Sequence, residues 1–259
     1  MKLIIRFFKW LFLFVLGAVL LAGLLLTVEG GARNVSSPKE AVFAVKEYEP
    51  GQAAGRYASL IKTYGRNKVL PKGFELQSLL ALSHYPELKD VPIRFVMQPA
   101  SLQLAARPDP WSLLLPWESR VYQVVISNDT GHKNDPILLS RLPFNEQVGI
   151  IGHELAHVVF YLNKKAFYFV SLGYKYAFRF REFAPGFERS TDRRAIAHGL
   201  GYQLYDFAFY VRKAFGQTLQ QIQQERGSLY LSPAEIADEM AKFKFYKAAL
   251  NPPESYFRN

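Results

Sequence analysis

The sequence predicts an α+β fold, a mainly helical domain with a small sheet, preceded by one N-terminal transmembrane helix. Three observations lead to this class. The chain opens with a long apolar segment, and helix-start signals recur along the rest of it. Only two short stretches are rich in the β-branched and aromatic residues that are typical of strands. About 230 residues remain beyond the apolar segment, enough for one large domain or two small ones.

The transmembrane helix is predicted from residues 10–28, an apolar run without a charged residue. A helix of this length spans roughly 28 Å, close to the hydrocarbon thickness of a bilayer. Residues 1–9 contain three basic side chains, so the positive-inside rule places the N-terminus in the cytoplasm and the main domain outside it. The alternative is a cleaved signal and a secreted protein, but secretory signals usually have a shorter apolar stretch, and Leu21-Ala22-Gly23 is a poor cleavage site. Residues 29–36 are expected to form a short polar linker.

The main domain is expected to occupy residues 37–259. It opens with Ser37-Pro38-Lys39-Glu40, a capping box with proline at the first helical position, which predicts a helix that ends near Pro50. Further helices are expected over residues 53–63 and 74–84.

Two strands are expected next. Residues 91–97 are typical of a short strand, and Pro92 places it at a sheet edge or marks its start. The clearest strand is residues 121–126, which are mostly β-branched or aromatic. Between the two strands, residues 106–117 hold three prolines and are expected to form a loop.

The second half of the chain is predicted to be helical. Helices are expected over residues 143–163, 166–180, 187–214 and 232–245. The last of them begins with a second capping box, Ser232-Pro233-Ala234-Glu235.

The segment that carries chemistry is His153-Glu154-Leu155-Ala156-His157, an H-E-x-x-H motif on a predicted helix. Residues four apart on a helix lie about 40° apart in azimuth and one turn apart in height, so the two imidazoles can bind one Zn²⁺ ion. Glu154 points close by and can reach a water at the metal, which makes it the candidate general base and proton shuttle.

Two surface histidines that flank a solvated glutamate are the alternative explanation of the motif. The flanking residues are apolar, however, which indicates a helix buried on much of its circumference. They are Val148, Ile150, Ile151, Leu155, Val158, Val159 and Phe160. Buried imidazole and carboxylate groups need a polar partner, and a metal ion supplies one.

A zinc peptidase needs a third protein ligand. The chain contains no cysteine, so thiolate ligands are excluded, as are disulfides and a cysteine nucleophile. The H-E-x-x-H-x-x-G-x-x-H pattern is also excluded, because Phe160 and Asn163 stand at its glycine and histidine positions. The remaining common source is a glutamate on a later helix, and Glu188 is the candidate. Asp192 lies four residues further on the same helical face and could accept a hydrogen bond from the outer N–H of a ligating imidazole.

The motif His-Glu-Leu-Ala-His, followed at this distance by F-E-x-x-x-D-x-x-A, resembles the glutamate-zincin (gluzincin) metallopeptidases. It is most similar to the Ste24-like family of membrane-associated endopeptidases, over roughly residues 120–200. The resemblance implies a zincin-like metallopeptidase domain with its metal-site core in that range. The roles it implies are zinc ligands His153, His157 and Glu188, the base Glu154, and Asp192 as a carboxylate behind a ligand.

Two further expectations concern the substrate. In zincins the strand before the metal helix often binds extended substrate by strand addition, and residues 121–126 stand in that place; an ordinary sheet edge is the alternative. The oxyanion of the tetrahedral intermediate needs a hydrogen-bond donor, and Arg193, His198, Tyr202 and Tyr205 are candidates by residue type. A satisfied structural histidine is the alternative for His198.

The formal net charge is +10. Because the basic residues are scattered and no nucleic-acid motif accompanies them, we expect a membrane rather than nucleic acid as the partner, with an ordinary solvated surface as the alternative. Residues 166–183 interleave aromatic and basic side chains. This pattern is typical either of a helix in the membrane interface or of a core helix with solvated basic residues.

The sequence therefore predicts a membrane-anchored, zinc-dependent metallopeptidase, and the resemblance implies an endopeptidase. Its partners are expected to be the membrane and a peptide or protein substrate that can itself be membrane-associated. One alternative is a catalytically silent zinc-binding module with an interaction or regulatory role on the membrane. Another is a structural membrane protein in which the motif occurs by chance.

Overall fold

The computed structural model describes residue 17 and residues 43–250, except residues 116–118, 133–134 and 227–228. The membrane helix expected at residues 10–28 lies outside the described residues, apart from Gly17, and so do residues 1–9, the linker at 29–36 and the capping box expected at Ser37. Among the residues that are described, no helix combines the length and the apolar character needed to cross a membrane.

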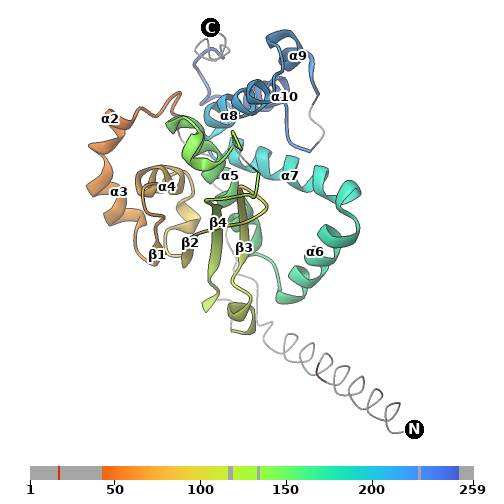
Figure 1. The fold of residues 1–259 in the computed structure, drawn as a ribbon. Coiled ribbons are helices and arrows are strands. Elements are labelled where there is room, and N and C mark those ends of the chain that lie inside the picture. The colour runs from red at the N-terminus through yellow and green to blue at the C-terminus, as the bar shows by residue number, and fades with distance from the viewer. Residues whose placement is uncertain (1–16, 18–42, 116–118, 133–134, 227–228, 251–259) are drawn as a thin grey trace.

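The described chain is a mixed α+β fold with one small sheet of four strands (Figure 1). In spatial order the strands are β1 (Lys68–Val69), β2 (Ile93–Gln98), β4 (Tyr122–Ser127) and β3 (Leu104–Pro108). The first three run parallel to one another, and β3 runs antiparallel to β4. Within the described residues β3 is therefore an edge strand.

The order of the strands corrects the expected place of substrate pairing. The strand expected at residues 121–126 is β4, at residues 122–127, and it is paired on both sides, so the expectation that this strand offers an edge is wrong. Residues 106–117 are not all loop, because β3 ends at Pro108; proline is tolerated at the end of an edge strand, where its missing N–H breaks no ladder. Two positions are expected for Pro92, a sheet edge or the start of a strand. The structure shows the second, because Pro92 directly precedes Ile93, the first residue of the internal strand β2.

Helices surround the sheet, with α2 to α4 on one side of it and α6 and α7 on the other in the view of Figure 1. They are α2 (Pro50–Ala54), α3 (Tyr57–Tyr64), α4 (Glu75–Leu82), α5 (Phe144–Leu162), α6 (Ala166–Phe178), α7 (Phe180–Ala197), α8 (Gly201–Ala214), α9 (Leu219–Gln224) and α10 (Pro233–Met240). The helices expected at residues 74–84, 143–163 and 166–180 are confirmed, and so is the capping box at Ser232.

Four expected helices have other boundaries in the structure. The helix expected over residues 53–63 is interrupted, since α2 ends at Ala54 and α3 begins at Tyr57, and the helix expected over residues 232–245 ends at Met240. The other two differ for identifiable reasons. Residues 43–49 are not helical, and Pro50 begins α2 instead of ending a helix, because a proline favours extended backbone in the preceding residue, here Glu49. The helix expected over residues 187–214 is two helices, α7 and α8. They separate at Gly199, whose φ of +87° is the left-handed conformation that ends many helices.

The helix α5 is buried on nearly all sides and forms the centre of the domain. It packs against α4, α7, α8 and β3. A side chain at Gly149 would meet the backbone of Gln203, so this glycine is what lets α5 and α8 approach closely. The H-E-x-x-H segment therefore lies on a rigid and fully packed element.

Candidate metal centre

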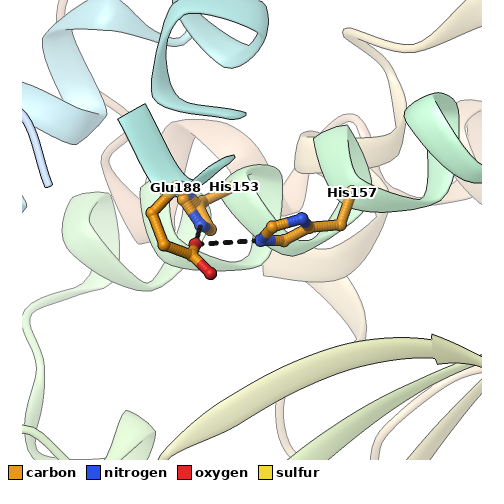
Figure 2. A group of neighbouring side chains, drawn as sticks. All are labelled: His153, His157 and Glu188. Carbon is orange, nitrogen blue, oxygen red and sulfur yellow. Dashed lines mark hydrogen bonds and ion pairs between the residues drawn. The ribbon is translucent and has the colours of Figure 1, made fainter. Parts of the chain in front are cut away.

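Three buried side chains from two helices form the centre of the site. Helix α5 carries His153 and His157 one turn apart, and α7 carries Glu188 (Figure 2). The Oε2 atom of Glu188 lies 3.2 Å from Nε2 of His153 and 3.1 Å from Nε2 of His157. One ligand atom from each residue lies within 4.8 Å of the other two. This group could bind a metal ion, as the sequence predicts.

The connection between α5 and α7 explains how a residue so far along the chain reaches the histidines. Helix α6 takes the chain past the end of α5, and a single non-helical residue, Arg179, separates it from α7. The α7 helix then returns across α5 with Phe187, Glu188, Thr191 and Asp192 buried. The predicted spacing between the motif and Glu188 is thus filled by one helix and its turn.

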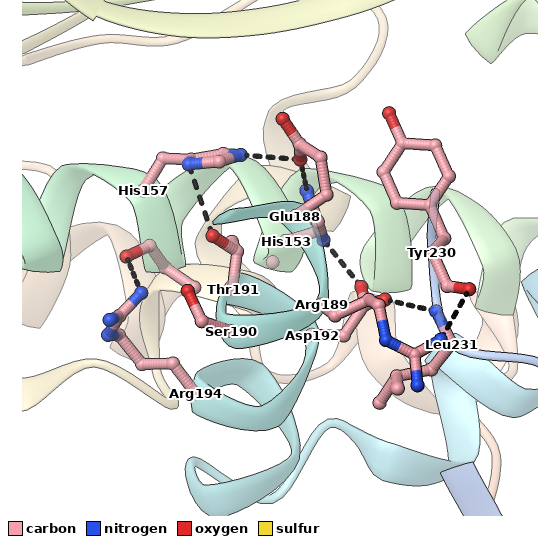
Figure 3. Close-up of polar contacts among 12 residues, drawn as sticks. His153, His157, Glu188, Arg189, Ser190, Thr191, Asp192, Arg194, Tyr230 and Leu231 are labelled. Carbon is pink, nitrogen blue, oxygen red and sulfur yellow. Dashed lines mark hydrogen bonds and ion pairs between the residues drawn. The ribbon is translucent and has the colours of Figure 1, made fainter. Parts of the chain in front are cut away.

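The outer nitrogen of each imidazole has a hydrogen-bond partner on α7 (Figure 3). Nδ1 of His153 lies 2.8 Å from Oδ1 of Asp192, and Nδ1 of His157 lies 3.3 Å from Oγ1 of Thr191. The Thr191 hydroxyl donates its proton to the carbonyl of Phe187, so it accepts from His157. Both rings therefore carry their proton on Nδ1 and direct the lone pair of Nε2 toward Glu188.

The electrostatics of the group call for a positive charge at its centre. Two nitrogen lone pairs and a carboxylate oxygen face one another, and a cation or an added proton must separate them. Burial lowers the pKa of His153, but hydrogen bonds to Asp192 and Glu188 outweigh burial and raise this pKa well above its ordinary value. Burial raises the pKa of Glu188, yet its bonds to His153 and His157 hold it well below the usual range. A metal ion would compete with a proton for this position.

Glu154 lies beside the ligands and faces the sheet. It is buried, and its carboxylate accepts a hydrogen bond from the backbone N–H of Ala106 on β3. Burial raises the pKa of Glu154, although His157 and His153 oppose the shift. The side chain therefore stands between the metal-ligating group and the edge strand.

Two tyrosines that sequence reasoning did not select lie at the site. The hydroxyl of Tyr176 on α6 donates to Oε1 of Glu188 over 2.6 Å, and the ring of Tyr230 lies 5.7 Å from that of His153. Burial raises the pKa of both phenols, and the charge of Glu188 raises them further. The chain has 15 tyrosines, so composition alone gave no reason to choose these two.

Three of the residues proposed as oxyanion donors have other partners. His198 Nε2 bonds Glu87 Oε1 at 2.7 Å, and Arg193 pairs with Glu239 at 2.9 Å. The Tyr202 hydroxyl donates to the carbonyl of Ala248. His198 is thus a satisfied buried histidine, the alternative that its sequence position allowed. Tyr205 is buried on α8 and is not among the residues that line the two cavities described next.

Two cavities meet at Glu154. One is an open cleft between β3 and α6, with Glu154, His157 and Glu188 at its floor. The other is a largely apolar cavity of about 140 Å³ that is also lined by His153 and Glu154. Its apolar lining includes Leu104, Ile150, Leu204, Phe207, Val211 and Ile236. Tyr230 lines both cavities and stands where they join.

No family model matches this sequence, and neither a curated protein nor a solved structure matches it. The function has to be inferred from the geometry of the site itself.

Proposed function

We propose that the protein is a zinc-dependent metallopeptidase of the zincin type. In this proposal His153, His157 and Glu188 hold the zinc ion, Glu154 is the general base, and Asp192 orients a ligand. One observation carries the proposal. Both Nε2 atoms of the H-E-x-x-H motif converge on one carboxylate oxygen at the floor of a cleft, with the motif glutamate beside them.

The donor set and its spacing fit zinc. Zinc binds imidazole nitrogen and carboxylate oxygen at about 2.0–2.2 Å, so two ligands of a tetrahedral site lie about 3.3–3.6 Å apart. The separations of 3.2 and 3.1 Å between Oε2 of Glu188 and the two Nε2 atoms are close to that value. Three protein ligands with an open fourth position are typical of catalytic rather than structural zinc sites.

Zinc, when bound, supplies a Lewis acid that polarises a peptide carbonyl and acidifies water. Glu154 supplies the proton transfers: it accepts the proton of the attacking water and passes it to the leaving amine. Because burial raises its pKa, the carboxyl is suited to hold a proton between these two events. Asp192 and Thr191 keep both imidazoles in the tautomer that leaves Nε2 available.

The edge strand β3 is the proposed substrate platform in place of β4. The backbone of Gln103 and Asp109 pairs with β4, and antiparallel partners alternate, so the backbone of Leu104 and Ala106 faces away from the sheet. The Ala106 N–H donates to Glu154, so an extended peptide would add to this edge through the other outward backbone groups. All five residues of β3 line the cleft, a length of roughly 17 Å of strand, which favours an endopeptidase over an enzyme that removes terminal residues.

The apolar cavity gives the proposed enzyme a side-chain preference. An engineered apolar cavity of about 150 Å³ binds benzene, so this cavity of about 140 Å³ has room for a phenyl or branched aliphatic side chain. The cavity adjoins Glu154, so we propose that it binds the apolar side chain of a substrate residue next to the scissile bond. The cavity is then the specificity element of the enzyme.

Tyr230 is the proposed donor to the oxyanion. It lines both cavities, and Figure 3 shows its hydroxyl on the same side as the Oε1 atom of Glu188, away from the bond between Asp192 and Leu231. Tyr176 already donates to Glu188 and is better suited to hold that carboxylate in place. A phenol at this position would stabilise developing negative charge.

The enzyme is proposed to be anchored by residues 10–28, with its catalytic domain outside the cytoplasm. The support is the apolar run and the basic residues before it. A reporter enzyme that is active only outside the cytoplasm, fused to the C-terminus, should be active. An inactive fusion, together with activity of a second fusion whose reporter works only in the cytoplasm, would refute the topology.

The proposal is tested with Glu154→Gln in the full-length protein. The variant should retain zinc at wild-type stoichiometry and lose cleavage of a proteome-derived peptide mixture, with new termini counted by mass spectrometry. Glu146→Gln is the matched control, because Glu146 is a buried glutamate on the same helix that lines neither cavity. Undiminished cleavage by Glu154→Gln would refute the catalytic role. Zinc binding without cleavage by the wild type would instead favour a silent zinc-binding module.

A further inference from the structure

The outer face of α6 is apolar along its whole length. Val170, Tyr174 and Phe178 follow one another at intervals of four residues, which places them on one side of the helix. Their exposed fractions are 55%, 57% and 76%. Phe167 continues the same stripe at 55%. The opposite side of α6 packs into the domain through the buried Leu172, and Phe169 and Tyr176 on that side are packed against the core. The helix thus presents large apolar side chains to both the core and the surroundings.

The charge around this stripe is mainly positive, although the exposed Glu182 just beyond it pairs with Arg179. Residues 164–181 contain five basic residues and no acidic residue. Two of the basic residues precede the helix, two follow its end and Lys175 lies within it. Exposed apolar stripes flanked by lysine and arginine are the signature of helices that lie in the plane of a membrane, with the apolar face among the acyl chains and the cations at anionic headgroups.

From this arrangement we infer that the outer face of α6 docks on an anionic lipid surface. A second copy of the chain is the less suitable occupant, because a two-fold contact sets the same patch against itself and would bring two sets of five basic residues together. An anionic membrane offers both a place for the apolar stripe and countercharges for its rim.

The same placement orients the cleft. Gly173 and Phe169 of α6 line the cleft, and so does Leu113, two residues along the chain from Trp111, which is 80% exposed. Two separate segments that line the cleft are therefore adjacent in sequence to exposed apolar side chains that can enter the interface. Resting on the proposed peptidase function, this implies that the preferred substrates are peptide segments at or just outside the membrane surface.

The test uses the absence of native cysteine, so that a single Val170→Cys substitution gives a unique labelling site. The full-length protein carries an environment-sensitive fluorophore at this position and is reconstituted into phosphatidylcholine vesicles with or without phosphatidylglycerol. Lys62→Cys is the control, because Lys62 is exposed on α3, across the domain from α6 in Figure 1. Quenchers fixed at known depths in the lipid measure the position of each label.

We expect the label at position 170 to lie roughly 5–10 Å inside the headgroup–acyl boundary of the anionic vesicles. It should be shallower in neutral vesicles, and the label at position 62 should escape lipid quenching in both. Equal quenching of the labels at the two positions by the lipid quenchers would overturn the inference. A label at position 170 that is shielded from water only at high protein concentration and is not quenched by the lipid quenchers would also overturn it, because that result indicates a protein partner. The measurement needs neither zinc nor turnover, so its failure is distinct from failure of the peptidase proposal.

Discussion

His153 and Asp192 are joined by a hydrogen bond of 2.8 Å between Nδ1 and Oδ1, and this bond ties the metal-ligating group to a distant part of the chain. The second oxygen of Asp192 accepts the backbone N–H of Leu231 at 2.9 Å. Leu231 directly follows Tyr230, the residue at which the two cavities meet. One carboxylate therefore sets both the tautomer of a ligand and the position of the segment that closes the site.

Replacement of Asp192 by alanine should weaken metal binding without abolishing it. The outer N–H of His153 would lose its acceptor, and loss of such a partner typically costs 10–100-fold in metal affinity. Competition with a chromophoric chelator measures the affinity. Asp238→Ala is the control, since Asp238 is an exposed partner of Arg226. An affinity equal to that of the wild type would show that Asp192 does not orient the ligand.

A Tyr230→Phe substitution should lower kcat and leave KM nearly unchanged, because a donor to the oxyanion acts only in the transition state. Loss of one such donor costs about 10²–10³-fold in kcat in a well-studied protease. Steady-state kinetics on a cleaved peptide identified with the wild type provide the measurement. If KM rises while kcat holds, Tyr230 contacts the substrate but does not stabilise the oxyanion.

The apolar cavity should control which peptides are cleaved. Val211→Phe places a larger side chain in its wall and should reduce kcat/KM for peptides with a large apolar residue beside the scissile bond relative to those with alanine. Changes of one methylene in an apolar pocket alter selectivity by about 10–200-fold, so a change within that range is expected. Cleavage-site profiling of both enzymes measures it. An unchanged ratio would place the specificity element elsewhere.

Stability should fall as the pH rises from about 4 to about 7, because of two buried carboxyl groups away from the metal centre. Burial raises the pKa of Glu146 from 4.5 to about 7, and that of Asp206 from 3.8 to about 7. Between the unfolded and folded pKa values the native state holds more protons than the unfolded chain, so the free energy of unfolding decreases with pH there and levels off above about pH 7.

Glu146→Gln should therefore raise the melting temperature more at pH 8 than at pH 5. Thermal melts of the metal-free protein at the two pH values provide the measurement, which keeps zinc out of the comparison. Glu182→Gln is the control, because Glu182 is exposed and paired with Arg179. A melting temperature that shifts equally at both pH values would contradict the assignment to Glu146.

The local elements of the site could be predicted from the sequence because they depend on short-range patterns. The apolar residues around the H-E-x-x-H motif indicate a buried helix, and α5 has that character. The spacing of Glu188 and Asp192 places both on one helical face, and α7 brings both to His153. These inferences needed only the helical repeat and the chemistry of the donors.

The parts that sequence reasoning missed depend on long-range pairing. The short strand β3 is rich in alanine and ends in proline, so its local composition resembles a loop, and only its pairing with β4 defines it. Tyr176 and Tyr230 lie far apart in sequence from the motif and carry no spacing signal. Thr191 supports His157 through a hydroxyl whose direction depends on how α7 crosses α5.

The most direct test of the central claim is anomalous diffraction at the zinc absorption edge from crystals of the protein purified with zinc. The account predicts a single strong peak at about 2.0–2.2 Å from Nε2 of His153, Nε2 of His157 and a carboxylate oxygen of Glu188, and its loss in Glu188→Ala. Zinc-loaded crystals with no peak among these three side chains, or a peak that persists unchanged in Glu188→Ala, would contradict it.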